Sequence, residues 1–374
     1  MRCLSLVGIL EQLLEAKEAI PNKLLLITED RSYTYKEFSN YCDAISVELQ
    51  KKGIKRGDKV AIVLEKYDEF YAALLAVWQV GAVAVPLNTT LNDIQLQDLI
   101  NRSLSCLLIS NSSLGKSLIC DNLIEMDRFL PCQYEFSPSA KIRPDELAVI
   151  MFTSGTTGMP KGVCQTYFSQ CENARLTAEV LRLSSNDRVF INTPPYFTSG
   201  LSHFVTLLMV RGSLTGVKRF YFGKDLLMAI SQYDCTGFGG APAHLIRVVE
   251  TLTEPFTNNK ITFWMSSGDY LPKAITEKAK TLLPNVRLYN VYGLTEVSGR
   301  LCVLDPIHIH SKCGSVGRPI GKMTVTIRDE NYNTLPSFEV GEVFVDGPLL
   351  MMGYFNAPDL TVKALTSYGF KTGD

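Results

Sequence analysis

Short apolar runs alternate along most of the chain with stretches in which apolar residues recur every three or four positions. The predicted strands are Lys59–Leu64, Val83–Pro86, Leu107–Ile109 and Leu147–Phe152, and the predicted helices are Glu69–Val80 and Leu96–Arg102. Alternating strands and helices of this kind are typical of α/β proteins with largely parallel sheets. In such sheets ligands lie beyond the carboxyl ends of the strands, where loops join strands to helices.

The pattern changes after about residue 305. Thr324–Ile327 and Gly341–Val345, with the Gly, Asn and Pro residues around them, are typical of β-hairpins without intervening helices. We therefore predict an α/β region over residues 1–310 and a smaller β-rich subdomain over residues 311–374.

The apolar residues near the amino terminus do not predict export. Cys3–Leu10 leads directly into Glu11–Glu15 without a small-residue cleavage site, so the segment is predicted to form an amphipathic first helix. The most apolar stretch, Ala72–Leu87, is interrupted by polar and helix-breaking residues and is too short to span a bilayer. No membrane span is predicted.

Composition narrows the class of protein further. The 374 residues include 46% apolar and 20% charged positions, which is typical of a globular chain with more than one core. The net charge of −1 and the scattered basic residues do not predict a nucleic-acid partner. Ten cysteines at irregular spacings indicate reduced thiols, and a cytoplasmic location is expected.

The most informative segment is the loop that follows the predicted strand Leu147–Phe152. It combines glycines, which let backbone amides approach an anion, with hydroxyl side chains and a lysine that supplies positive charge. No Gly-Lys-Ser/Thr sequence closes the loop onto a helix, so it is not a Walker A loop. The predicted residues for the β- and γ-phosphates of a nucleotide are Thr153, Ser154, Gly155, Thr156, Thr157, Gly158 and Lys161.

This loop resembles the signature loop of the adenylate-forming superfamily, which includes acyl-CoA synthetases, adenylation domains of nonribosomal peptide synthetases, and luciferases. Tyr33–Phe38 and Gly81–Asn88 resemble the first two family motifs and are predicted to be structural, as a hairpin and a buried strand. Gly341–Tyr354 resembles a later motif, also predicted to be largely structural. Because the motifs follow the family order across nearly the whole chain, the resemblance is specific.

Three further segments match the nucleotide-binding motifs of the family. By resemblance, Tyr292 flanks the adenine, Thr295 hydrogen-bonds the α-phosphate, and Asp374 accepts hydrogen bonds from the ribose hydroxyls. By the same resemblance Glu296 holds Mg²⁺, and the chemistry agrees, since a hard cation that bridges phosphates prefers carboxylate oxygen. The adenylate-binding residues implied in these segments are Gly268, Asp269, Tyr270, Asn290, Val291, Tyr292, Gly293, Thr295 and Asp374.

The resemblance implies two interleaved, doubly wound α/β subdomains within residues 1–310, with the ATP and acyl site at their junction. The β-rich part is expected to be a small distorted barrel. In relatives a mobile lid domain with a further lysine follows the position of Asp374. The chain is therefore expected to be a trimmed core that binds nucleotide and acyl-adenylate but turns over poorly.

The implied activity is activation of a carboxylic acid as its acyl-adenylate, with release of pyrophosphate, followed by transfer to a thiol. ATP and Mg²⁺ are the expected cofactors, and the thiol is CoA or the phosphopantetheine of an acyl carrier protein. Lys161, Thr295 and Glu296 are predicted to stabilise the charge that develops on the phosphates. No general base is needed, because a carboxylate is already ionised at neutral pH.

The segment around Phe197 matches the fourth family motif, and its residue types indicate which acid is activated. Amino-acid-activating relatives usually carry an aspartate there, and this chain has Phe197, so a fatty, short-chain or aryl acid is favoured. The glycine pair at 239 and 240 either opens a deep slot or forms a tight turn, and the sequence leaves both interpretations open. The substrate pocket implied by resemblance comprises Phe197, Ser202, His203, Gly239, Gly240, Ala241 and Val291.

Other interpretations carry less weight. An amino-acid adenylation domain is the alternative activity, and a non-catalytic nucleotide-binding module conflicts with the intact motif residues. A zinc site is not predicted, because His308, His310 and the nearby cysteines lack a standard ligand spacing. Cys164 and Cys171 are predicted to be packed thiols rather than nucleophiles.

Overall fold

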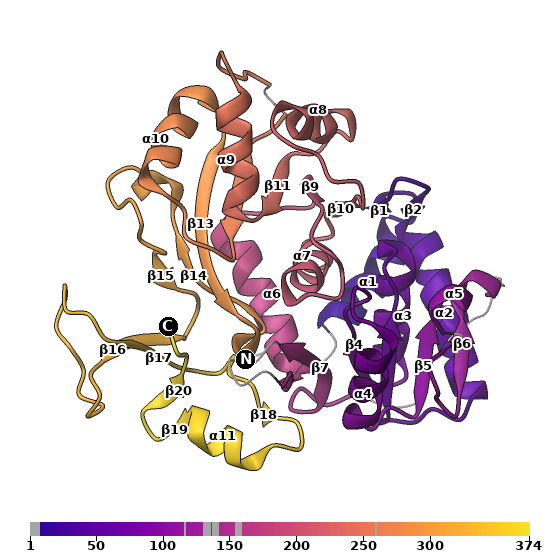
Figure 1. Cartoon of the computed structure of the whole chain (residues 1–374). Helices are drawn as coiled ribbons and strands as arrows, with labels where there is room; N and C mark the ends of the chain where they lie inside the picture. Colours follow the sequence, from indigo (N-terminus) through magenta and orange to yellow (C-terminus); the bar gives the residue numbers. More distant parts are fainter. Residues whose placement is uncertain (1–7, 116, 130–135, 137–141, 154–158, 259) are drawn as a thin grey trace.

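The computed structural model describes residues 8–115, 117–129, 136, 142–153, 159–258 and 260–374 (Figure 1). Its largest sheet has nine strands in the order β15-β14-β13-β12-β11-β9-β10-β1-β2. Neighbours from β1 to β13 run parallel, and antiparallel strands stand at both edges. The strands are β1 (Leu24–Ile27), β2 (Ser32–Thr34), β9 (Arg188–Ile191), β10 (Ser213–Gly216), β11 (Gly237–Gly240), β12 (Phe263–Ser267), β13 (Arg287–Leu294), β14 (Gly299–Leu304) and β15 (Arg318–Pro319).

A second, seven-stranded sheet has the order β18-β8-β7-β4-β3-β5-β6. Its strands are β3 (Lys59–Val63), β4 (Val83–Pro86), β5 (Leu107–Ser110), β6 (Leu123–Glu125), β7 (Leu147–Thr153), β8 (Lys161–Thr166) and β18 (Gly353–Tyr354). A third, four-stranded antiparallel sheet lies at the bottom of Figure 1, beside the yellow helix α11. It contains β16 (Thr324–Arg328), β17 (Glu342–Asp346), β20 (Gly369–Lys371) and β19 (Leu365–Thr366), in that order.

Helices fill the space between the two large sheets and cover their outer faces. α6 contacts β7 and β8 of one sheet and β14 of the other, and the rings of Tyr71 on α3 and Phe204 on α7 stack 4.1 Å apart. In Figure 1, α6 and α7 lie between the orange strands and the purple amino-terminal elements. The helices are α1 (Gly8–Ala19), α2 (Tyr35–Lys51), α3 (Tyr67–Gln79), α4 (Asp93–Ser103), α5 (Ser112–Gly115), α6 (Tyr167–Leu181), α7 (Thr198–Met209), α8 (Lys224–Gln232), α9 (Pro242–Thr251), α10 (Lys273–Leu282) and α11 (Pro358–Ala364), with 3₁₀ turns η1 (Met126–Arg128), η2 (Thr295–Val297) and η3 (Pro306–His308).

Local sequence explains where several of these elements begin. α2 starts at a capping box, in which the Thr34 hydroxyl accepts from the backbone N–H of Glu37 and the Glu37 carboxylate accepts from that of Thr34. The prediction that Tyr33–Phe38 forms a hairpin is therefore wrong beyond Thr34, because the capping box turns the following residues into helix. α9 begins at Pro242, a favoured first helical residue, since proline has no N–H to leave unpaired in a first turn.

The predicted strands of the seven-stranded sheet agree with the structure to within a residue or two at each end, and its two predicted helices lie within α3 and α4. The carboxyl-terminal segment, however, joins all three sheets, because β15 pairs with β14 and β18 pairs with β8. The division at residue 311 stays a prediction. Within the described residues, no helix has both the length and the apolar character that a membrane crossing requires.

Candidate active site

A cavity of about 150 Å³ lies at the carboxyl ends of β12 and β13, where the open parallel sheet places ligands. It brings together residues from three segments that are far apart in the sequence: the start of α7, the end of β12, and the β13–β14 hairpin. Among the residues that the structure describes, none with an acidic side chain lines it. The lining residues are Thr198, Ser199, Ser267, Gly268, Val291, Gly293, Leu294, Thr295, Gly299 and Arg300.

The predicted phosphate lysine and the predicted magnesium ligand meet through a tyrosine. Lys161 Nζ lies 5.3 Å from the centroid of the Tyr354 ring, and the Tyr354 hydroxyl donates to Glu296 Oε1 at 3.0 Å. Pairing of β18 with β8 holds Tyr354 beside the strand that starts at Lys161. Burial, followed by the negative charge of Glu296, raises the pKa of Tyr354, so the phenol remains protonated as a donor. The sequence had indicated only a structural role for this tyrosine.

Thr295, predicted to face the α-phosphate, is held from two sides. Its hydroxyl oxygen lies 3.0 Å from that of Thr198, the first residue of α7, and its carbonyl accepts a hydrogen bond from the Gln165 amide. Thr295 thereby connects β8 of one large sheet, where Gln165 lies, with the cavity of the other. Neither Thr198 nor Gln165 was predicted to be a site residue, because only the tertiary structure brings them to the motif.

Of the predicted adenine and ribose residues, Gly268 lines the cavity, whereas Tyr292 and Asp374 are not among its lining residues. Gly268 has a φ of +95°, and the space where a Cβ would stand is open, which leaves room for a flat ring. The Tyr292 hydroxyl donates to a carboxylate oxygen of Asp374. Burial and this carboxylate raise the pKa of Tyr292. Asp269 accepts from the backbone N–H of Tyr270 at 2.7 Å, and both residues are exposed.

The predicted substrate residues are distributed over α7 and β11. His203 is buried, and its ring lies against the backbone of Gly239, where an added Cβ would stand only 2.1 Å from His203 Cε1. The glycine at 239 therefore leaves space for the His203 ring. The glycine pair forms neither a deep slot nor a tight turn, because Gly237–Gly240 is a strand whose Gly239 packs against that ring. Phe197 precedes α7 with 45% of its surface exposed and does not line the cavity.

The remaining predicted substrate residues, Ser202, Gly240 and Ala241, do not line the cavity either. Ser202 is buried one turn into α7, and its Oγ lies 3.0 Å from the place of an added Cβ at Gly299, behind the cavity wall. Asn290 is buried, and its amide donates to the Ser315 carbonyl at 2.9 Å, so it supports β13 from the side.

Residues 154–158 of the predicted phosphate loop lie outside the described residues; their flanks Thr153 and Lys161 pair across the β7–β8 hairpin.

The thiols near this hairpin are poor nucleophiles, because burial raises the pKa of Cys164 and of Cys171 to about 11. Among the side chains that the structure describes, no cluster of three or more metal-ligating groups occurs. A single carboxylate such as Glu296 is sufficient for Mg²⁺ that is bound mainly by phosphates and water.

Buried His203 makes acid stability a testable property. Burial, reinforced by the positive charge of Arg300, holds the pKa of His203 well below its ordinary value, so the folded protein keeps the ring neutral. The unfolded chain takes up a proton as the pH falls through about 6.5, and the free energy of unfolding should then decrease by up to about 1.4 kcal/mol per pH unit. We expect urea midpoints to drop between pH 7 and pH 5.5.

Two variants separate the contributions of His203 and His244 to the change in the free energy of unfolding with pH. His203→Gln should show a shallower decrease than the wild type, and His244→Gln should remove a second part, because burial also lowers the pKa of His244. An unchanged slope in His203→Gln would contradict the assignment of a buried neutral imidazole.

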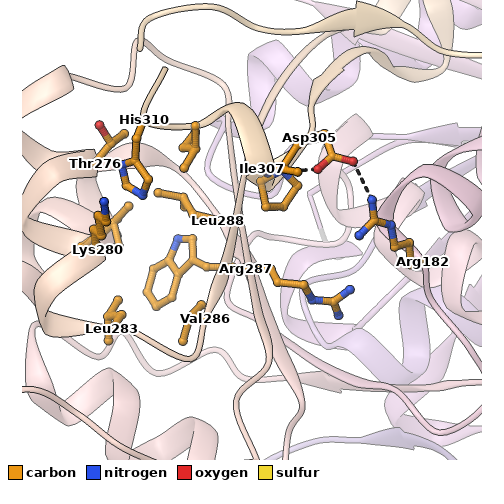
Figure 2. A pocket seen from close by; sticks show the side chains of 15 residues that line it. Arg182, Thr276, Lys280, Leu283, Val286, Arg287, Leu288, Asp305, Ile307 and His310 are labelled. Atoms are coloured by element: carbon orange, nitrogen blue, oxygen red, sulfur yellow. Dashed lines mark hydrogen bonds and ion pairs between the residues drawn. The ribbon is translucent and has the colours of Figure 1, made fainter. Parts of the chain in front are cut away.

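A second cavity, of about 410 Å³, lies elsewhere on the nine-stranded sheet (Figure 2). Figure 2 shows Lys280 and His310 on one side of it and, on the other, the ion pair between Arg182 and Asp305, whose atoms are 2.7 Å apart. Arg287, at the first position of β13, also lines it, so the cavity is at the amino end of that strand. No predicted site residue lines it, and it lies away from the sheet edge where an open parallel sheet binds its ligand.

The structure brings the residues predicted to bind phosphate, Mg²⁺ and ribose together through Tyr354 and Tyr292: Lys161 and Glu296 at the first, and Asp374 at the second. The chain belongs to the AMP-binding enzyme family, whose sequence model matches residues 14–355. It is 27% identical over 361 residues to 2-succinylbenzoate–CoA ligase of Oceanobacillus iheyensis, covering 95% of this chain and 73% of that protein. It is 26% identical over 392 residues to medium-chain fatty-acid–CoA ligase of Escherichia coli, covering 96% and 68%.

Among solved structures, the chain resembles o-succinylbenzoate CoA synthetase from Bacillus subtilis in complex with the acyl-adenylate intermediate. The TM-score is 0.87 at 26% identity, over 97% of this chain and 74% of that one. The same enzyme in complex with ATP and magnesium ion gives a TM-score of 0.86. The predicted fold class, the ATP-dependent acid–thiol ligase activity, and the cofactors ATP, Mg²⁺ and CoA are confirmed at the level of the family.

Proposed function

We propose that this enzyme activates an organic acid without a charged amine as its acyl-adenylate, at the cavity between α7 and the β13–β14 hairpin, and transfers the acyl group to CoA. The observation that carries the proposal is the contact series from Lys161 through Tyr354 to Glu296, beside Thr295. A cation, a metal-binding carboxylate and a hydroxyl placed this way match the charges of a nucleotide triphosphate.

The residues have separate roles in the first half-reaction. Lys161 and the hairpin hold the leaving pyrophosphate, and Thr295, fixed by Thr198, orients the α-phosphate for attack by the substrate carboxylate. Glu296 would hold Mg²⁺: its Oε1 accepts from Tyr354, and a carboxylate has lone pairs left for a metal. The ion, when bound, neutralises charge on the phosphates. Chemistry then rests on positioning and electrostatics, because the attacking carboxylate is already ionised.

The choice of acid is supported by the charge of the cavity. An amino acid brings an ammonium group that needs an anionic partner, and the described part of the chain contributes no carboxylate to the cavity lining. Arg300 lines it instead and would repel an ammonium group. The relatives named above act on 2-succinylbenzoate and on medium-chain fatty acids, which also lack an amine. Both considerations favour a carboxylic acid over the amino-acid alternative.

We infer the acceptor thiol from the named relatives and the cellular location from the cysteines. We take CoA as the acceptor because the named relatives are CoA ligases, and a carrier-protein phosphopantetheine is the other outcome of an acceptor assay. We place the enzyme in the cytoplasm, where thiols stay reduced, since the eight cysteines that the structure describes are free.

A ligand panel tests the proposal. Melting temperatures would be measured with AMP and with sulfamoyl adenosines that carry fatty acyl, aryl and aminoacyl groups. A ligand at about one hundred times its Kd stabilises the folded state by about 2.7 kcal/mol, so one acyl class should raise the melting temperature well above AMP. If an aminoacyl analogue binds best, the amino-acid alternative replaces the proposal. If no compound binds, AMP included, the nucleotide site itself is refuted.

A further inference from the structure

Arg300 is a buried cation for which the described residues supply no anion. It lies at the second position of β14, is 4% exposed, and its Nη1 has no hydrogen-bond partner. The hydrogen bonds of Arg300 to other described residues involve its backbone: Asn173 accepts from the N–H at 3.4 Å and donates to the carbonyl at 2.7 Å. Burial alone lowers the pKa of the guanidinium, to about 10, so it remains charged at neutral pH. An uncompensated buried charge is costly, and it persists where a ligand supplies the partner.

Arg300 is a lining residue of two cavities. It lines the adenylate cavity of about 150 Å³, and it also lines an enclosed cavity of about 10 Å³ that His203 and Thr206 share. His203 Nε2 and Thr206 Oγ1 have no partner among the described residues either. The enclosed cavity is about the size of one water molecule, which can satisfy this polar cluster from behind. A larger anionic group therefore reaches Arg300 only from the adenylate cavity.

The residues that line the two cavities indicate which charge a partner of Arg300 must carry. No aspartate or glutamate of the described segments lines either cavity, and His203 is kept neutral by burial, so Arg300 is the charged side chain of the pair. The phosphates already have a predicted cation in Lys161, which Tyr354 connects to Glu296. Arg300 instead shares a cavity with His203, one of the predicted substrate residues. A planar guanidinium at such a place suits a carboxylate, which it can bind through two parallel hydrogen bonds.

We propose that Arg300 binds a second carboxylate on the acid that this enzyme activates, so that its substrate is a dicarboxylic acid. The proposal rests on the proposed acid activation and makes Arg300 a specificity-determining residue for it. One carboxylate reacts at the α-phosphate beside Thr295, and the other pairs with Arg300 deeper in the cavity. The cavity would then select against simple fatty or aryl acids, since these leave the guanidinium desolvated and unpaired.

Matched pairs of ligands test this directly. Sulfamoyl adenosines bearing hexanoyl and adipoyl groups, or benzoyl and phthaloyl groups, differ in the presence of the second carboxylate, and AMP is the common reference. Their Kd values would be measured by calorimetry on the wild type and on Arg300→Met, Arg300→Lys and Arg318→Met, the last being an exposed arginine on the adjacent strand β15. The wild type and Arg318→Met should bind the carboxylate-bearing member about tenfold to a hundredfold more tightly.

Arg300→Met should lose or reverse that preference with AMP affinity unchanged within about twofold, while Arg300→Lys should retain part of it. The melting temperature of unliganded Arg300→Met should equal or exceed that of the wild type, because a buried unpaired charge is removed. Equal affinity of the wild type for both members of every pair would overturn the proposal, as would a parallel loss of AMP binding in Arg300→Met. If monocarboxylate analogues bind well and dicarboxylate ones do not, acid activation stands and only the dicarboxylate assignment fails.

Discussion

Replacing Glu296 with glutamine is expected to slow pyrophosphate exchange into ATP by about 10²- to 10³-fold, the usual loss when one fixed electrostatic stabiliser of a transition state is removed. The amide keeps the shape of the side chain and can still accept from the Tyr354 hydroxyl, which lies 3.0 Å from Glu296 Oε1. What it loses is the negative charge that would hold Mg²⁺ against the phosphates. The exchange rate would be measured with the acid whose sulfamoyl adenosine binds best.

Two comparisons make this result specific. Glu339→Gln, at an exposed position of the chain, should exchange at the wild-type rate. Tyr354→Phe keeps the ring beside Lys161 and removes only the hydrogen bond to Glu296, so its loss should be about tenfold or less. Calorimetry of ATP binding as a function of Mg²⁺ concentration gives a second readout. An ATP affinity in Glu296→Gln that depends on Mg²⁺ as in the wild type would refute the metal assignment.

Gly293→Ala is expected to destabilise the fold by about 3 kcal/mol, the upper part of the usual range for overpacking, and to abolish exchange. A Cβ at this position would stand 1.9 Å from the carbonyl oxygen of Gly299 on the facing strand. The obstacle is backbone, not a flexible side chain, so β14 must move. That movement would displace Arg300, the next residue along β14, and widen the hairpin that carries Thr295. Urea unfolding and the exchange assay would measure both effects.

The control for this variant is another glycine with room for a methyl group. An added Cβ at Gly8, in the first turn of α1, would meet its nearest neighbour, the methyl carbon of Met209, at an ordinary 3.6 Å. Gly8→Ala should change the free energy of unfolding by no more than about 0.5 kcal/mol. A Gly293→Ala protein that is as stable and as active as Gly8→Ala would show that the β13–β14 hairpin tolerates movement that the structure does not allow.

The sequence by itself determined the class of the fold and the order of the motifs. Buried strands such as Lys59–Val63 are continuous apolar runs, and helix starts such as Pro242 follow local backbone rules, so both are readable without a structure. Lys161, Thr295 and Glu296 were selected from their motifs, and the structure places Tyr354 between Lys161 and Glu296; their roles in binding phosphate and Mg²⁺ stay predictions.

Contacts between distant segments were decided only by the tertiary structure. Tyr354 joins Lys161 to Glu296 because β18 pairs with β8, a pairing that no local pattern encodes. The reason for the glycine at 239 was invisible in the sequence, since it depends on the ring of a histidine thirty-six positions earlier, His203.

The burial of Arg300 likewise could not be predicted from the sequence. An arginine in a hairpin is ordinarily exposed, and no sequence pattern indicates that this one is buried with no anion among the described residues. Local sequence determines which elements form, because hydrogen-bonding and apolar periodicity act over a few residues. Which charges are desolvated depends on how those elements pack, and it is desolvation that makes a side chain able to select a substrate.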